Sequence, residues 1–449
     1  MVWSNDHGLR TISGTDVQYG LVSFDAEGKE ISEHGGLMSQ RLVDKARTDK
    51  VTNVFFFCHG WKGDVPAAKE QYGLWIKAFA NAKDREKASI HFPNFRPLFI
   101  GLHWPSLPFG DEEVGAASFA ARTAVLGADA LLQKYLERLG DSPEIRGPLE
   151  IIIKEARRNA SPDELPPHIK KAYIDLNDAL GLKSEGVDAP PDADREGFDP
   201  EDSFEAGNEG PASFGGGGIN LGGLLGPLRQ LSYWTMKKRA RTIGEGGMHD
   251  FLKNMQTATA GSHTGIYLMG HSFGTIVVSG MLGGPNAAGK LPRPVDSVAL
   301  VQGAVSLWCY AGKIPFDGAG QGYFSRILAD QKVRGPIVTT QSTHDNAVGV
   351  LYPFASRIKG SANFAQTFPE FGAIGAFGLQ GLPDSSRSEL KMLGASDVYS
   401  FESGKIYNVD GSQFIAHMDG VSGAHSDIAG PEVAHLIWAA AFASAAGRA

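Results

Sequence analysis

Residues 265–282 read GIYLMGHSFGTIVVSGML, and this stretch decides the fold. Its first five residues form an apolar run typical of a buried strand, and the residues after Gly274 have the composition of a buried helix. Between them lies Gly270-His271-Ser272-Phe273-Gly274, a Gly-x-Ser-x-Gly pattern. The chain has 57 glycines, so the pattern alone carries little weight. Its place between a strand and a helix is what makes it informative.

A sharp turn between strand and helix suits a nucleophilic serine. Gly270 and Gly274 let neighbouring backbone approach the turn closely, so that the Oγ of Ser272 stands clear of the sheet edge. The helix that follows directs its positive dipole end and free N–H groups at the place where an oxyanion would develop. The pattern predicts Ser272 as a nucleophile and the N–H of Phe273 as an oxyanion donor. The alternative is a glycine-rich turn with an incidental serine.

Further apolar runs bounded by turn residues predict a sheet around this strand. With 265–269, the predicted strands are 17–24, 51–58, 97–103, 295–301, 336–340 and 405–409. The clearest helical stretches are 37–48, 67–80, 273–282 and 432–445. Strands separated by helices predict an α/β protein whose mostly parallel sheet is covered by helices on both faces.

One block interrupts this alternation. Between about 106 and 242 no strand is predicted, and residues 181–226 are first acidic and proline-rich, then glycine-rich and apolar. Such composition is typical of flexible loops and lids. We therefore predict a core made of residues 1–105 and 243–449, with residues 106–242 inserted as a helical cap or lid whose 181–226 part is flexible. A stabilising decoration is the alternative.

The strand at 51–58 runs into a second candidate turn, Cys58-His59-Gly60-Trp61. Gly60 permits a sharp bend, and the next N–H, that of Trp61, can then point at a substrate oxygen. We predict Trp61 as the second oxyanion donor, with His59 and Gly60 in support. A plain turn at the end of a strand is the alternative.

These motifs resemble the α/β-hydrolase superfamily. The likeness is to a bacterial branch with a His-Gly-Trp turn and a Trp-Pro-Ser segment after the next strand, here Trp104-Pro105-Ser106. It covers about 17–106 and 232–445 and leaves out the insertion. The resemblance implies an eight-stranded, mostly parallel sheet and a Ser–acid–His triad in that chain order. It implies no metal and no organic cofactor.

The acid of such a triad follows a later strand. Asp345 lies in the loop after the strand at 336–340, at the edge where α/β sheets collect catalytic groups. Asp330 precedes that strand, Asp317 has no strand before it, and the strand ending at Val301 has no carboxylate after it. We predict Asp345 as the acid, a cap or turn carboxylate being the alternative.

Three histidines compete for the role of base. His435 lies within the last predicted helix, where packing explains it. His417 and His425 both follow the strand at 405–409, and His425 lies in a loop of small residues just before a helix that begins near Pro431. The loop and the helix start match the family's pattern, so His425 is favoured over His417.

Ser272, Asp345 and His425 together predict a serine hydrolase that cleaves carboxylic esters, with a lipase-like preference as one expectation. An amidase or thioesterase with the same triad stays open, because acyl-transfer machinery does not choose the leaving group. A non-catalytic binding module is the rival from another class. His271 and His344 flank triad positions, and a supporting or packing role is favoured over metal binding, for which the histidine spacing is wrong.

Composition excludes several other classes. The net charge is −8, and no cluster of Lys and Arg with interleaved aromatics indicates nucleic-acid binding. The basic run at 237–241 is predicted to be the solvated face of a helix, and Tyr233-Trp234 before it to be packing. No apolar run of membrane-spanning length occurs. Transient contact with a lipid surface stays open, and the oligomeric state is not indicated.

Location is predicted from two absences. The N-terminus shows no basic start followed by an apolar run, so a secretory signal is not expected. The two cysteines, Cys58 and Cys309, make no disulfide framework. Both features fit a cytoplasmic protein. Export by a route that needs no cleaved signal stays open.

Overall fold

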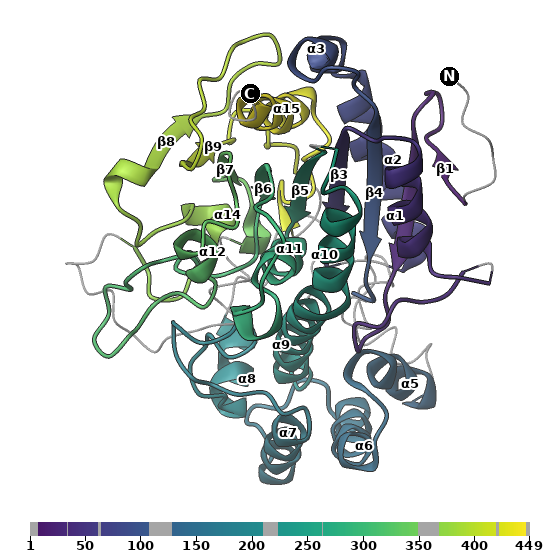
Figure 1. Cartoon of the computed structure of the whole chain (residues 1–449). Coiled ribbons are helices and arrows are strands. Elements are labelled where there is room, and N and C mark those ends of the chain that lie inside the picture. Colours follow the sequence, from purple (N-terminus) through teal and green to yellow (C-terminus); the bar gives the residue numbers. More distant parts are fainter. Residues whose placement is uncertain are drawn as a thin grey trace.

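A nine-stranded sheet forms the centre of the molecule (Figure 1). The computed structural model describes residues 8–33, 35–61, 64–106, 128–209, 223–262, 264–348, 368–418 and 422–445. The strand order is β1-β2-β4-β3-β5-β6-β7-β9-β8. β1 runs antiparallel to β2, and the other neighbours are parallel. The predicted α/β class with a mostly parallel sheet is confirmed.

The strands are β1 (Arg10–Thr11), β2 (Gln18–Ser23), β3 (Asn53–Cys58), β4 (Pro97–His103), β5 (Gly265–His271), β6 (Ser297–Val301), β7 (Ile337–Gln341), β8 (Arg387–Lys391) and β9 (Ile406–Asp410). The seven predicted strands correspond to β2–β7 and β9. β1 has only two residues, and β8 is a polar edge strand, RSELK, with no fully buried residue. Neither carries the apolar pattern by which a buried strand is predicted.

Helices cover both faces of the sheet and create two separate cores. One face packs against α1 (Met38–Thr48), α10 (His249–Ala258) and α11 (Gly274–Gly283). The other packs against α2 (Val65–Asn81), α3 (Lys83–His91) and α15 (Pro431–Ala445). Because the central strands are covered on both sides, β3 reads NVFFFC and is buried at every position.

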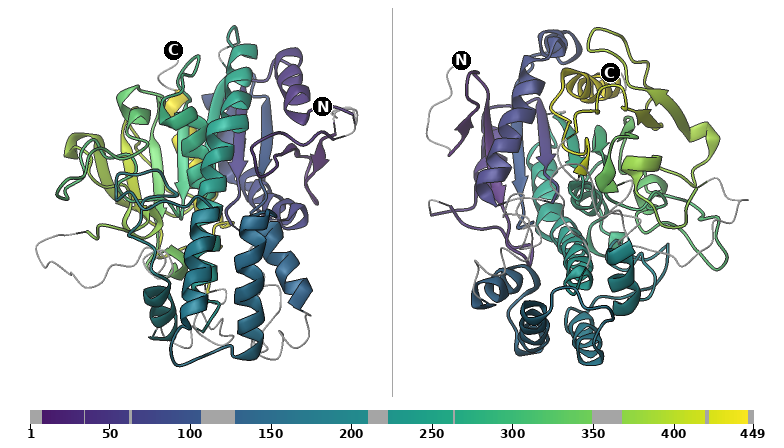
Figure 2. Two further views of the ribbon diagram at one scale, coloured as in Figure 1. Left: turned by 90° about the horizontal axis from the view of Figure 1, so that it is seen from below. Right: turned by 180° about the vertical axis from the view of Figure 1, so that it is seen from behind.

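The predicted insertion lies between β4 and β5 and contains five helices in its described part. They are α5 (Ala128–Leu139), α6 (Pro143–Arg158), α7 (Pro167–Ala179), α8 (Pro200–Glu209) and α9 (Gly226–Ile243). Figure 2 shows α5–α8 gathered beyond one end of the sheet, the end toward which β4 points in Figure 1. α9 returns into the core and continues through the π-helical turn Gly244–Met248 into α10.

Short elements complete the described chain. They are the 3-10 turns Pro285–Ala287 and Asp384–Ser386 and the one-turn helices α12 (Arg326–Ala329) and α14 (Ile374–Phe377). Within the described ranges, no helix has both the length and the apolar character needed to span a membrane.

Buried ion pairs join the acidic part of the insertion to α9. The side chain of Lys237 is fully buried, 2.7 Å from the Oδ1 of Asp194 and 4.2 Å from the centre of the Trp234 ring. The Nε of Arg241 lies 2.5 Å from the Oδ1 of Asp192. The prediction that 237–241 is a solvated face is therefore wrong for Lys237 and Arg241. The acidic stretch supplies the carboxylates that pair them, a role that its composition did not indicate. Residues 210–222 lie outside the described residues.

Candidate active site

The turn between β5 and α11 holds Ser272 in an uncommon backbone conformation. Its φ angle is 55°, a value that costs energy for any residue other than glycine. The turn is fixed from β6, since the Ser272 N–H donates to the Val301 carbonyl at 3.2 Å and the Ser272 carbonyl accepts from the Ala304 N–H at 3.2 Å. Strain maintained in this way is typical of functional positions.

Both glycines of the motif are required by close backbone contacts. A Cβ on Gly270 would lie 2.5 Å from the Gly274 carbonyl oxygen, and a Cβ on Gly274 would clash with the Cys58 carbonyl at the end of β3. The turn therefore packs backbone against backbone between two neighbouring strands. A larger residue at position 274 would push the Ser272 turn away from β3, and one at position 270 would push the start of α11 away from the end of β5.

The Gly60-Trp61 turn after β3 lies directly against Ser272. A Cβ on Gly60 would clash with the Ser272 Cβ and lie 3.0 Å from its Oγ. The rings of Trp61 and Phe273 stack, with centroids 5.6 Å apart. Within the described contacts, the N–H of Phe273 has no acceptor. The two predicted oxyanion donors thus belong to residues whose rings are in contact, and both lie next to the serine turn.

Asp345 and His425 form a buried hydrogen-bonded pair. The Nδ1 of His425 lies 2.7 Å from the Oδ2 of Asp345. Because Nδ1 faces a carboxylate it carries the proton, and this leaves Nε2 unprotonated in the neutral imidazole. The two loops also pair through their backbones, since the Ala424 N–H donates to the His344 carbonyl at 2.8 Å. Gly423 makes this possible, because its φ is 62° and a Cβ there would clash with the same carbonyl.

His271 connects the serine turn to the histidine loop. Its Nε2 lies 2.8 Å from the backbone carbonyl oxygen of His425, and the two rings have centroids 4.8 Å apart. Ser272, the next residue, is thereby held beside the His425 loop. His344, the other flanking histidine, is exposed and contributes its backbone carbonyl to the loop pairing.

Gln302 is a residue of this site that the sequence analysis missed. It follows β6, and its Nε2 donates to the Oδ2 of Asp345 at 2.9 Å. The hydroxyl of Thr340 donates to the Gln302 Oε1 at 3.0 Å and so fixes the orientation of the amide. Besides His425 and Gln302, the N–H of Val348 also donates to Asp345, to its Oδ1 at 3.1 Å. The sequence pattern of a triad predicts a carboxylate after a strand, and an amide that supports the acid gives no such signal.

The competing histidines lie in other surroundings. His417 is exposed, and its backbone N–H donates to Asp427 at 2.7 Å. His435 lies on α15 and its Nδ1 is 2.7 Å from the Oδ2 of Asp84 on α3. This second His–Asp pair joins two helices on one face of the sheet, and the contact between these helices is enough to explain its presence.

A further histidine pair lies beneath the Gly60 turn. The Nε2 of His59 is 3.0 Å from the Nδ1 of His103, and both rings are buried. Burial, with a smaller contribution from the charge of His103, lowers the pKa of His59 to about 3. Burial also lowers the pKa of His103 to about 4, against an opposing effect of Asp64. Both imidazoles are therefore neutral at pH 7.

This pair predicts a loss of stability in acid. Below about pH 6.5 the unfolded chain binds protons that the folded pair does not, so the free energy of unfolding falls as the pH falls toward 4. The slope is at most about 1.4 kcal/mol per pH unit for each histidine. His103→Asn keeps an N–H donor but removes one titrating group, so urea unfolding between about pH 6.5 and 4.5 should show a shallower slope. Equal slopes in the variant and the wild type would contradict this assignment.

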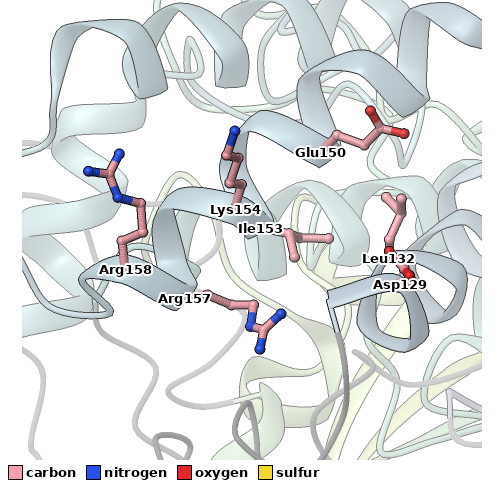
Figure 3. A pocket seen from close by; sticks show the side chains of 7 residues that line it. All are labelled: Asp129, Leu132, Glu150, Ile153, Lys154, Arg157 and Arg158. Carbon is pink, nitrogen blue, oxygen red and sulfur yellow. The ribbon is translucent and has the colours of Figure 1, made fainter.

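A hollow of about 630 Å³ between α5 and α6 is separate from the Ser272 turn. Figure 3 shows its lining: Asp129, Leu132, Glu150, Ile153, Lys154, Arg157 and Arg158. Five of these seven side chains are charged, and none is a serine, cysteine or histidine. The lining of the hollow therefore offers no hydroxyl, thiol or imidazole group, and its charged side chains do not resemble an apolar site for an acyl group.

In the part of the chain that the structure describes, no three His, Cys, Asp or Glu side chains gather as a metal ion would need.

The candidate site is made of residues that follow β3, β5, β6, β7 and β9, at the edge of the sheet where these parallel strands end. Comparisons with models of protein families, with curated proteins and with solved structures found no match for this chain.

Proposed function

We propose that this chain is a serine hydrolase of the α/β-hydrolase fold that cleaves carboxylic esters through an acyl-enzyme on Ser272. The observation that carries the proposal is the buried pair of His425 and Asp345, at 2.7 Å, on a loop that His271 ties to the Ser272 turn. An isolated His–Asp pair has many structural uses. One that is tied to a strained serine at the carboxyl end of a central strand suits nucleophilic catalysis.

The mechanism follows from the assigned proton positions. The Nε2 of His425 takes the proton of the Ser272 hydroxyl while Oγ attacks the acyl carbon. The N–H groups of Trp61 and Phe273 stabilise the oxyanion of the tetrahedral intermediate. His425 then gives its proton to the leaving alkoxide, and the alcohol departs. Water, deprotonated by His425, attacks the acyl-enzyme and releases the acid, which restores the Ser272 hydroxyl.

Asp345 maintains this geometry throughout. Its carboxylate accepts from His425, Gln302 and the Val348 N–H, so it holds the imidazole in one tautomer and stabilises the imidazolium. The order of the elements supports the α/β-hydrolase assignment, with the serine after β5, the acid after β7 and the histidine after β9.

The surroundings of Ser272 favour a substrate with an apolar group. Tyr233, on α9 of the insertion, packs against Phe273 and Trp61 with ring centroids 5.0 and 5.8 Å apart. The insertion therefore packs an aromatic side chain against Phe273, the residue that follows the serine. Apolar packing of this kind beside the serine suits an acyl chain or an aromatic alcohol.

Hydrolysis of p-nitrophenyl esters from acetate to palmitate tests the proposal. We expect turnover by the wild type and its loss in Ser272→Ala, because the variant lacks the Oγ on which the acyl-enzyme would form. Ser279→Ala is the matched control, since Ser279 is a buried serine on α11 that bonds to the Thr275 carbonyl and the Tyr310 hydroxyl. Ester turnover that survives in Ser272→Ala would contradict the proposal, and the preferred chain length would give the size of the acyl site.

A further inference from the structure

The carbonyl group of Gly60 accepts two hydrogen bonds from side chains. The Nδ1 of His59 lies 2.8 Å from the Gly60 oxygen, and the Ser106 hydroxyl donates to the same oxygen at 3.0 Å. A backbone carbonyl has two lone pairs, so both are occupied. Ser106 follows β4 and His59 follows β3, so donors from two neighbouring strands hold one peptide group.

These bonds fix the direction of the next N–H. The Gly60–Trp61 peptide is planar and trans, and therefore its N–H points away from its C=O. With the oxygen held by His59 and Ser106, the peptide cannot rotate without breaking two buried hydrogen bonds. Gly60 itself lies against the Ser272 side chain. The N–H of Trp61 is thereby set in place before a substrate arrives, as an oxyanion donor must be.

The ring of His59 is held in the tautomer that this role needs. Its Nδ1 faces a carbonyl oxygen and carries the proton, so its Nε2 must accept. The Nδ1 of His103 lies 3.0 Å from that Nε2, and the N–H of Trp104 approaches it at 3.4 Å. The His59 carbonyl in turn accepts from the indole N–H of Trp104 at 3.0 Å. His103 thus acts on the Gly60 peptide through His59.

We propose that Ser106 and His103 are positioning residues of the oxyanion hole, acting through the Gly60 carbonyl and the His59 ring. The inference rests on the proposed function, since it concerns the same reaction. The inference goes beyond the proposed function because it assigns a role to the end of β4, which contains no member of the triad. A role confined to packing between β3 and β4 is the competing explanation, and it predicts no special effect on the transition state.

Ser106→Ala separates the two explanations. We expect kcat to fall about tenfold with KM unchanged, a smaller loss than removal of an oxyanion donor causes. The inhibition constant of a trifluoromethyl ketone, which forms a tetrahedral adduct, should rise by the same factor. Ser444→Ala is the matched control, because the buried Ser444 hydroxyl also donates to a backbone carbonyl, that of Ala441. Unchanged kcat in Ser106→Ala, or an equal loss in Ser444→Ala, would overturn the proposal.

A second measurement needs neither a variant nor activity. Nitrogen NMR of the histidine-labelled wild type should find His59 neutral at pH 6 with its proton on Nδ1. A charged ring, or a proton on Nε2, would overturn the proposal even for an active enzyme. If the wild type neither hydrolyses esters nor reacts with a fluorophosphonate, the proposed function fails, whereas the His59 tautomer still decides whether the network exists.

Discussion

Asp345→Asn should lower kcat for ester hydrolysis about 10⁴-fold while the protein stays folded. The carboxylate faces the protonated Nδ1 of His425 at 2.7 Å. An asparagine can turn its NH₂ group toward Nδ1, which then becomes an acceptor, so that the proton moves to Nε2. Nε2 can no longer take the proton of Ser272, and the nucleophile loses its base. KM should change little, because Asp345 does not touch the substrate.

The chain supplies its own control for this variant. His435 and Asp84 form a second buried pair with the same 2.7 Å separation, but between α15 and α3. Asp84→Asn should reduce stability and leave kcat within about twofold of the wild type. Steady-state kinetics and thermal unfolding of both variants distinguish the cases. A similar loss of kcat in both would mean that Asp345 acts through stability and not as the catalytic acid.

Asp194→Asn should lower the free energy of unfolding by about 3–5 kcal/mol, the largest stability effect that we expect. The variant leaves the ammonium group of Lys237 fully buried without its carboxylate 2.7 Å away. Removing one partner of a buried pair costs far more than the pair contributes, because the remaining charge is not solvated. Urea unfolding at neutral pH measures the loss.

Two comparisons show whether burial of the charge is the cause. The double variant Asp194→Leu/Lys237→Met removes both charges and should recover most of the lost stability. Asp175→Asn breaks the exposed pair of Lys171 and Asp175 and should cost about 0–1 kcal/mol. A double variant as unstable as Asp194→Asn would contradict this explanation. The result also bears on any test of the predicted lid by deletion of residues 181–226. Such a deletion would remove Asp194, so loss of stability could be mistaken for a change in substrate specificity.

Sequence periodicity predicted the fold wherever burial dictates composition. Central strands such as β3 are covered on both faces and are therefore apolar at each position, which makes them visible in the sequence. β8 lies at the edge, where half-exposed polar residues suffice, and no pattern marks it. The seven strands predicted from the residues became nine, because the two-residue β1 and the polar β8 were added at the two edges of the sheet.

The candidate site was predictable where a motif fixes the backbone. The glycines around Ser272 and the loop of small residues before His425 reflect close backbone approaches that only small residues allow. Gln302 could not be found in this way, and Ser106 was noticed only as part of the Trp-Pro-Ser segment, without a role. An amide or a hydroxyl at the end of a strand acts only through contacts with residues that are distant in the sequence. Lys237 was misassigned for the same reason, since its partner Asp194 is 43 residues away in the sequence.

Labelling with a fluorophosphonate probe tests the central claim most directly. The probe reacts with a serine that is activated by a neighbouring base and leaves a stable adduct, which peptide mass spectrometry can locate. We predict one adduct, on Ser272 in the peptide containing Gly270-His271-Ser272-Phe273-Gly274, that is absent in Ser272→Ala and greatly slowed in Asp345→Asn. A folded wild type that remains unlabelled, or an adduct on another residue, would contradict the assignment of Ser272 as the nucleophile.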